Sequence, residues 1–211
     1  MKLALAPVAA ALALAGCASR GNEGPRLAQA LPPDWRSIAT EHDRERLREW
    51  RTAWMEAIRK VTASGQRLAL AREGALLQPD VAVDWRDPPP GEYSCRVIKM
   101  GAKQPGLLDY VAYPAFNCRI RQEEGMMSFA KLTGSQRPIG HLLPYNGQQR
   151  MVFLGTLQLG DERRSLEYGH DRERDMAGIV ERIGEQRWRL VLPYPAFEST
   201  IDILELVPRS S

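Results

Sequence analysis

Residues 91–122 read GEYSCRVIKMGAKQPGLLDYVAYPAFNCRIRQ, and this stretch decides the fold. Apolar and polar side chains alternate on both sides of its centre, first over Tyr93–Val97 and again over Phe116–Ile120. A period of two is typical of a β-strand with one buried face. Pro105-Gly106 lies between the two segments and favours a tight turn. The stretch therefore predicts an antiparallel β-hairpin.

The two cysteines of this hairpin, Cys95 and Cys118, lie on the apolar face of their strands. A symmetric hairpin centred near Pro105-Gly106 places them opposite each other on one side of the sheet, which predicts a disulfide. On the chain-entropy model such a link, closing a loop of about 23 residues, stabilises the fold by roughly 3 kcal/mol. The alternative is a pair of buried free thiols.

Further segments with strand character follow the hairpin, separated by turn signals such as Gly134-Ser135 and Asn146-Gly147. With no helices between them, eight short strands indicate an antiparallel meander over residues 88–211. Closure into a barrel similar to that of lipocalins would remove the exposed edges of so long a sheet. A barrel of eight strands is filled by its own side chains or holds one small ligand. The six further strands are expected at 127–133, 138–143, 150–159, 176–183, 187–192 and 201–207.

Residues 34–87 are expected to form a helical segment that packs on the barrel. One helix is predicted from a cap at Thr40 to Gly65, because apolar residues recur at helical spacing along one face. A second, shorter helix is predicted over 66–73, which would make a helical hairpin. The apolar face carries two tryptophans, for which docking on the barrel and stacking on a ligand are both open readings. Its residues are Leu47, Trp50, Trp54, Ile58 and Val61.

The first residues indicate export. Residues 1–16 have the layout of a signal peptide, with one lysine before a short apolar stretch. Leu14-Ala15-Gly16-Cys17 resembles the lipobox of bacterial lipoproteins, which implies cleavage before Cys17 and a lipid on its sulfur. Residues 17–33 then form a tether. An ordinary secretory signal is the alternative.

Export determines the expected location and partners. Ala18 follows the lipidated cysteine, so the resemblance implies the periplasmic face of the outer membrane. The membrane is thus a partner through the lipid anchor, and an oxidising compartment favours the disulfide. The net charge is +3 with acidic and basic residues interleaved. This pattern, with export, excludes nucleic acid as a partner.

Several strings along the chain together resemble a family of exported Gram-negative bacterial proteins catalogued only as a domain of unknown function. The resemblance spans residues from about Trp35 to Pro208 and implies a secreted helix-plus-β domain with no known activity. The strings that carry it are Trp35-Arg36, Asp43-Arg44 and Leu47-Arg48; Gly91–Lys99; Lys131–Pro138; Val152–Thr156; Tyr168–Asp171; Arg174-Asp175; Arg187–Leu190; and Glu205–Pro208.

No catalytic, phosphate-binding, dinucleotide-binding or zinc-binding motif is present, so no catalytic residue, metal or cofactor is predicted. The densest polar segment is Gly160–Asp175, the longest connection of the β region, and long loops are often functional. Pairing between its arginines and carboxylates is the ordinary alternative. His141 would point into the barrel if its strand face is inward. Lys131 and Arg137 suit either a tight turn or a binding site at the barrel mouth. The candidate binding residues are Asp161, Glu162, His170, Asp171, Asp175, His141, Lys131 and Arg137.

The sequence therefore favours a non-enzymatic, lipid-anchored envelope module that binds a small ligand or a protein partner. Two alternatives remain open: a structural component of an outer-membrane assembly, and an envelope hydrolase that uses the Asp161–Asp175 loop. In each case the function is expected at the barrel end that carries Gly160–Asp175.

Overall fold

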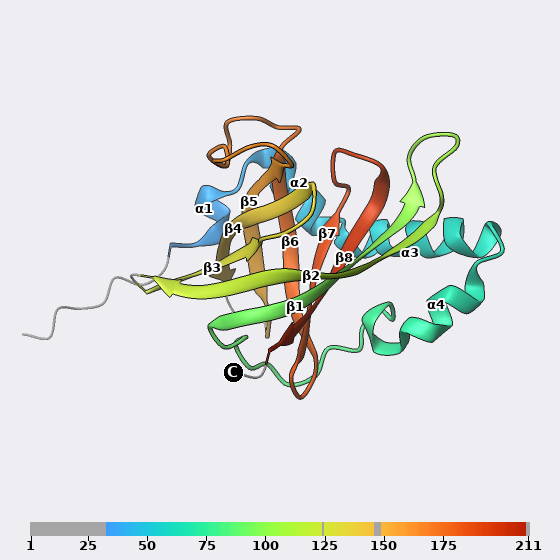
Figure 1. Ribbon diagram of the computed structural model, residues 1–211, viewed down its shortest axis with the longest axis horizontal. Coiled ribbons are helices and arrows are strands. Elements are labelled where there is room, and N and C mark those ends of the chain that lie inside the picture. The colour runs from blue at the N-terminus through green and yellow to red at the C-terminus, as the bar shows by residue number, and fades with distance from the viewer. Residues whose placement is uncertain (1–32, 124, 146–148, 210–211) are drawn as a thin grey trace, which may run out of the picture.

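A computed structural model describes residues 33–123, 125–145 and 149–209. Eight strands form a closed barrel in which each strand pairs antiparallel with the next and β8 pairs with β1 (Figure 1). The predicted closed antiparallel meander is therefore confirmed. The strands are β1 (Gly91–Ala102), β2 (Tyr110–Glu123), β3 (Met126–Lys131), β4 (Gln136–Pro144), β5 (Met151–Leu159), β6 (Asp175–Gly184), β7 (Arg187–Pro193) and β8 (Ser199–Pro208).

The hairpin of β1 and β2 contains the predicted disulfide but not the predicted register. Cys95 and Cys118 are bonded, with their Cα atoms 5.9 Å apart. Cys95 pairs with Phe116 across the ladder, and Cys118 pairs with Tyr93, so the cysteines are diagonal rather than opposite. The pairing next to the turn, Met100 with Tyr110, centres the hairpin on residue 105, and the register shift between Arg96 and Ile98 then moves the pairing by one residue, which leaves the partner of Cys95 two residues from Cys118. An offset of two residues keeps both sulfurs on the same face, so the bond still forms.

The helical segment precedes the barrel, and the long helix predicted there is divided in two at Glu49. Thr40 caps α2 as expected, its hydroxyl accepting from the backbone N–H of Asp43 at 3.2 Å. The single helix predicted from Thr40 to Gly65 is wrong, because Glu49 leaves the helical conformation (φ −95°, ψ 8°). α2 contacts β6, whereas α3 contacts β1, β7 and β8, so the chain changes direction to follow the curved barrel. The helices are α1 (Trp35–Ile38), α2 (Glu41–Arg48), α3 (Trp50–Ala63), α4 (Arg67–Glu73) and the 3₁₀ turn η1 (Gly74–Leu76).

Trp54 is the main anchor of α3 on the outside of the barrel. Its ring is fully buried, and its Nε1 donates to the carbonyl oxygen of Leu77 at 3.3 Å. Together with Ala57 and Val61 it packs on outward-facing side chains of β1 and β8, such as Ile98 and Ile203. Trp54 therefore docks the helix. Among the described residues, no helix has the length and apolar character needed to cross a membrane.

The middle of the barrel is filled by large side chains. Gly140 of β4 and Gly155 of β5 face each other there, where a Cβ on Gly140 would lie 2.3 Å from the carbonyl oxygen of Leu154. Glycine thus permits close approach of the two strands. Bulky residues of the interior cluster include Tyr93, Phe129, Met151, Phe153, Trp188 and Leu190.

One end of the barrel is closed by the segment that leads into β1. Trp85 packs against the interior cluster. The Nε1 of Trp188 donates to the carbonyl oxygen of Arg86 at 2.9 Å, and the hydroxyl of Tyr93 donates to that of Pro89 at 2.6 Å. Because strands alternate in direction, the connections β1–β2, β3–β4, β5–β6 and β7–β8 all lie at the other end. That end is the one that holds a cavity.

Candidate functional site

A cavity of about 230 Å³ opens at the barrel end formed by these four connections. Three of these connections, β3–β4, β5–β6 and β7–β8, contribute to its wall, as do residues of all eight strands. This is the end that carries Gly160–Asp175, and both Glu173 and Asp175 line the cavity. The cavity is smaller than most pockets for drug-sized ligands, which are about 300–1,000 Å³. It therefore suits a compact ligand or part of a larger one.

The floor of the cavity is apolar. Side chains alternate between the two faces of a strand, and each floor residue lies an even number of positions from the interior residues of its own strand. The floor residues therefore point into the barrel. Val97, for example, continues the inward series of Tyr93 and Cys95 in β1. Such a floor favours an apolar ligand body, because burial of apolar surface stabilises binding. The other floor residues are Leu157, Met176, Leu192 and Leu204.

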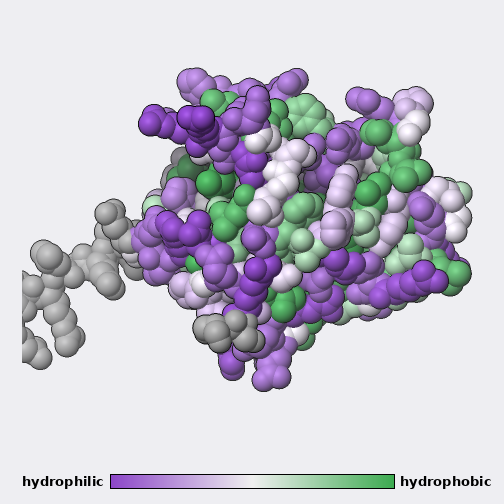
Figure 2. Space-filling view, viewed as in Figure 1, coloured by the Kyte–Doolittle hydropathy of each residue, from purple (hydrophilic) through white to green (hydrophobic). Residues whose placement is uncertain are grey.

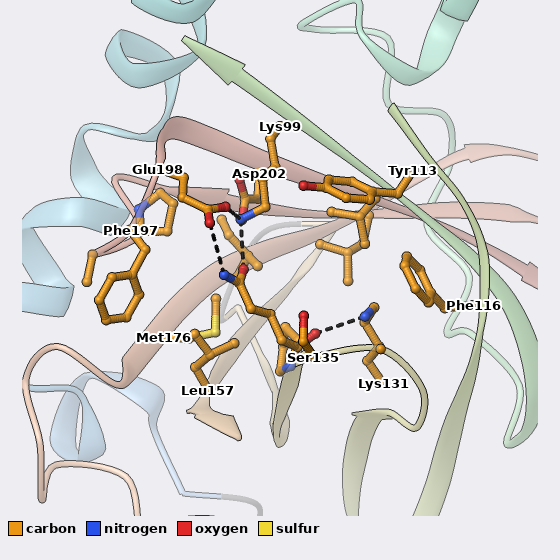
Figure 3. Close-up of a pocket in the computed structure, with 18 of the residues that line it drawn as sticks. Lys99, Tyr113, Phe116, Lys131, Ser135, Leu157, Met176, Phe197, Glu198 and Asp202 are labelled. Carbon is orange, nitrogen blue, oxygen red and sulfur yellow. Dashed lines mark hydrogen bonds and ion pairs between the residues drawn. The ribbon is translucent and has the colours of Figure 1, made fainter. Parts of the chain in front are cut away.

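One side of the cavity carries a charged network of one lysine and two carboxylates (Figure 3). The ammonium of Lys99 lies 2.8 Å from a carboxylate oxygen of Glu198 and 3.5 Å from one of Asp202. It also donates to the side-chain oxygen of Gln136 at 2.8 Å. Burial lowers the pKa of Lys99, but Asp202 and Glu198 outweigh burial and raise it above its ordinary value. Burial raises the pKa of Asp202, against the opposing effect of Lys99.

Lys131 occupies the opposite side of the cavity, near Phe116 (Figure 3). It is the last residue of β3, and its parity matches that of the inward Met127 and Phe129. Its ammonium donates to the carbonyl oxygens of Thr133 and Gln136, both at 2.8 Å. It also lies 3.6 Å from the centroid of the Phe116 ring. Burial, followed by smaller effects of Arg137 and Lys99, lowers the pKa of Lys131 to about 8.

Arg137, the neighbouring candidate, connects two loops and does not line the cavity. Its guanidinium donates to four backbone carbonyl oxygens, which belong to the β3–β4 turn and to the start of the β5–β6 loop. Gly134-Ser135 belongs to the β3–β4 turn and also lines the cavity, so a tight turn and a wall of the barrel mouth, the two alternatives left open by the sequence, are both present here. Arg137 holds that wall in place.

Apart from Glu173 and Asp175, the ionisable groups of the segment Gly160–Asp175 do not line the cavity. Glu162 accepts from the backbone N–H of Leu159 at 2.8 Å and from Arg174 at 2.5 Å, while Asp171 accepts from the backbone N–H of Glu173. Figure 2 shows that hydrophilic side chains dominate this loop. Of the predicted loop residues, only Asp175 reaches the cavity, where its carboxylate accepts from the backbone N–H of Gly169 at 2.8 Å and burial raises its pKa. The exposed loop residues include Asp161 and His170.

His141 lies outside the barrel, because its strand face is outward and the condition under which it would point into the barrel is not met. In β4 the inward residue next to it is Leu142, whereas Leu143 packs with α1 and α2 outside. His141 instead lines a groove of about 540 Å³ on the outer surface, beneath the loop residues Leu166 and Tyr168. The reason is parity: Ile139, His141 and Leu143 share the outer face, which is apolar because helices cover part of it.

Sequence reasoning missed Lys99, Asp202 and Glu198. A usable signal existed for two of them. Lys99 continues the parity of Cys95 and Val97, and Asp202 is a lone acid within an apolar strand, in phase with the inward Leu204. A charged residue that shares a strand face with the interior residues and lies near the end of the strand indicates the mouth of a barrel. Glu198 belongs to the β7–β8 loop, where no periodic pattern places it.

The arrangement as a whole is suited to binding. It combines an apolar floor, a network of Lys99, Glu198 and Asp202 on one side and the ammonium of Lys131 on the other. Within residues 33–123, 125–145 and 149–209, no group of three or more His, Cys, Asp or Glu side chains is placed to hold a metal ion.

Comparison with known proteins gives one match. The model of the family described as a domain of unknown function (DUF4893) matches residues 35–206, nearly the whole of the helical segment and barrel. Neither the curated proteins nor the solved structures include a match. The resemblance seen in the sequence is thereby confirmed at the level of the family. The chain belongs to the DUF4893 family of domains of unknown function.

Proposed function

We propose that this protein is a lipid-anchored envelope module that binds a small, compact ligand at the open end of its barrel. The cavity with its apolar floor is the observation that carries the proposal. Most of the barrel is packed solid, so the ligand enters only the last layer of the interior. The charged groups at the rim then orient its polar end, as in most small-molecule sites.

The anchor is the second part of the proposal. The signal layout and Leu14–Cys17 support export and lipidation, and they lie outside the described residues. The Cys95–Cys118 bond is consistent with an oxidising compartment. We place the domain on the periplasmic face of the outer membrane, where the tether at 17–33 keeps the barrel near the bilayer surface.

Replacing the anchor residue tests this part directly. Cys17→Ser removes the thiol that would accept the lipid, so the protein should lose its acyl mass and its partition into detergent. Mass spectrometry of the N-terminal peptide and phase separation measure both. A Ser variant that stays in the detergent phase like the native protein would show that Cys17 is not the anchor.

Binding is tested by calorimetric titration with 1-octanol, a compact apolar probe. Val97→Phe extends a floor side chain into the cavity, and we expect it to weaken binding by about tenfold or more, which is about 1.4 kcal/mol. Val207→Phe is the matched control, because Val207 is exposed near the end of β8. Circular dichroism checks that both variants fold. Failure of the native protein to bind, or equal affinity in a folded Val97→Phe variant, would refute the cavity as the site.

A further inference from the structure

The side chain of Lys131 is held at the cavity wall in an unusual electrostatic setting. The residue is 5% exposed. Two carbonyl oxygens and the Phe116 ring surround its ammonium on the protein side. Among the described residues it forms no ion pair with any Asp or Glu, and the charged groups that lower its pKa, Arg137 and Lys99, are cations. A buried charge without a counter-ion is costly, and proteins generally supply one.

Lys99 lines the same cavity but, unlike Lys131, has acidic partners. Its ammonium lies within 3.5 Å of two carboxylates, Glu198 and Asp202. The two lysines therefore differ in their surroundings: Lys99 faces two carboxylates, whereas Lys131 has no acidic partner among the described residues. An anionic group that enters is attracted to Lys131 and repelled by the acids that line the cavity, so a second negative charge on the ligand is disfavoured. Those acids are Glu173, Asp175, Glu198 and Asp202.

We propose that the ligand is an apolar monocarboxylate, such as a medium-chain fatty acid, whose carboxylate supplies the missing counter-ion of Lys131. This inference rests on the proposed function, because it assigns the head group of the ligand that the cavity takes. The hydrocarbon chain lies on the floor formed by Val97, Leu157 and Leu204. Ser135, on the same side as Lys131, lines the entrance beside the head group (Figure 3).

Charge on the ligand is the variable to test. Three probes of equal chain length are titrated into the full-length protein at pH 7: octanoate, 1-octanol and octylamine. We expect octanoate to bind about tenfold more tightly than 1-octanol, since a buried charge pair of this kind contributes about 1.4 kcal/mol. Octylamine, whose charge repels Lys131, should bind least tightly.

Variants assign the preference to one residue. Lys131→Met should bring the affinities for octanoate and 1-octanol to about the same value while leaving 1-octanol binding intact. Lys60→Met removes one lysine charge on α3, outside the cavity, and should keep the native preference. Lys131→Arg, which retains a positive charge, should preserve most of it.

The pH dependence gives a test on the native protein that needs no variant to fold. The carboxylate is ionised throughout this range, so affinity follows the charge on Lys131. Octanoate should therefore bind about tenfold more weakly at pH 10 than at pH 7, whereas 1-octanol should bind equally. The other ionisable groups that face the cavity are Lys99, Tyr113, Glu173, Asp175, Glu198 and Asp202.

The outcomes separate this inference from the proposed function. Equal affinity for octanoate and 1-octanol, or tighter binding of octylamine, would overturn the assignment of a carboxylate and leave the cavity as a ligand site. A preference for octanoate that survives in a folded Lys131→Met variant would also overturn it. Failure of all three probes to bind would refute the proposed function itself, and the inference with it.

Discussion

Arg189 of β7 joins the helical segment to the barrel, and its replacement by methionine tests how this fold is held together. The side chain is fully buried. Its Nε and Nη2 donate to one carboxylate oxygen of Glu181 at 3.0 and 2.7 Å, and its guanidinium lies 4.4 Å from the centroid of the Trp54 ring. Its Nη1 donates to the carbonyl oxygens of three residues in and after η1, which are Ala75, Leu76 and Gln78.

The expected loss of stability follows from what Arg189→Met leaves behind. Glu181 is 1% exposed and, among the described residues, keeps only Arg150 as an ion-pair partner, at 3.4 Å. Removing one member of a buried ion pair costs about 3–5 kcal/mol, because the remaining charge stays buried. Domains are stable by about 5–15 kcal/mol, so this loss is a large part of the total. The three carbonyl oxygens also lose their donor, which loosens the segment after α4.

Urea unfolding followed by circular dichroism measures the change in the free energy of unfolding. Arg187→Met is the matched control: the residue lies on the same strand, but its side chain is 34% exposed and pairs with Glu205 at the surface. We expect the control to change stability by less than about 1 kcal/mol. Adding Glu181→Leu to Arg189→Met should restore part of the loss, since no unpaired buried carboxylate then remains and Arg150, the other partner of Glu181, is partly exposed. A single Arg189→Met variant within about 1 kcal/mol of the native protein would refute the reasoning.

Three further predictions concern stability. Trp54→Ala should lower the free energy of unfolding by about 3–5 kcal/mol, because a fully buried ring is removed; an unchanged urea midpoint would show that α3 is not docked in solution. Reduction of the Cys95–Cys118 bond should cost about 3 kcal/mol, measured as a lower melting temperature in dithiothreitol, and no shift with both thiols free would contradict this. Burial lowers the pKa of Lys131 from 10.5 to about 8, so the unfolded state binds the proton more tightly. Stability should therefore rise with pH between about 8 and 10.5, by up to about 3 kcal/mol relative to Lys131→Met, and a difference that does not vary with pH would contradict the burial of this charge.

The strands and the disulfide were predictable because both depend on local periodicity. Alternation in β1 and β2 places Cys95 and Cys118 on one face whatever the pairing, as long as the offset is even. The register itself was not predictable, because it depends on where the turn is centred and on a shift between Arg96 and Ile98 that alternation within each strand does not reveal. The break at Glu49 likewise follows from the curvature of the barrel that the two helices cover.

The candidate site was predictable in its location but not in its composition. The barrel end that carries Gly160–Asp175 does hold the cavity, and Lys131 does line it. The loop that suggested this end, however, uses most of its charges internally, as with Glu162 and Arg174. Lys99 and Asp202 are distant in the sequence and become neighbours only because β8 closes the barrel against β1. Barrel closure pairs two strands that are far apart in the sequence, and the alternation of side chains within one strand does not reveal that pairing.

The central claim is that a compact apolar ligand binds in the cavity at the open end of the barrel. A methyl NMR titration with octanoate tests it most directly, because each methyl group reports its own position. We predict saturable shifts for the floor methyls of Val97, Leu157 and Met176, and none for Ile139 and Leu154, which line the outer groove. Saturable shifts confined to the groove methyls, or no saturable shift at all, would contradict the claim.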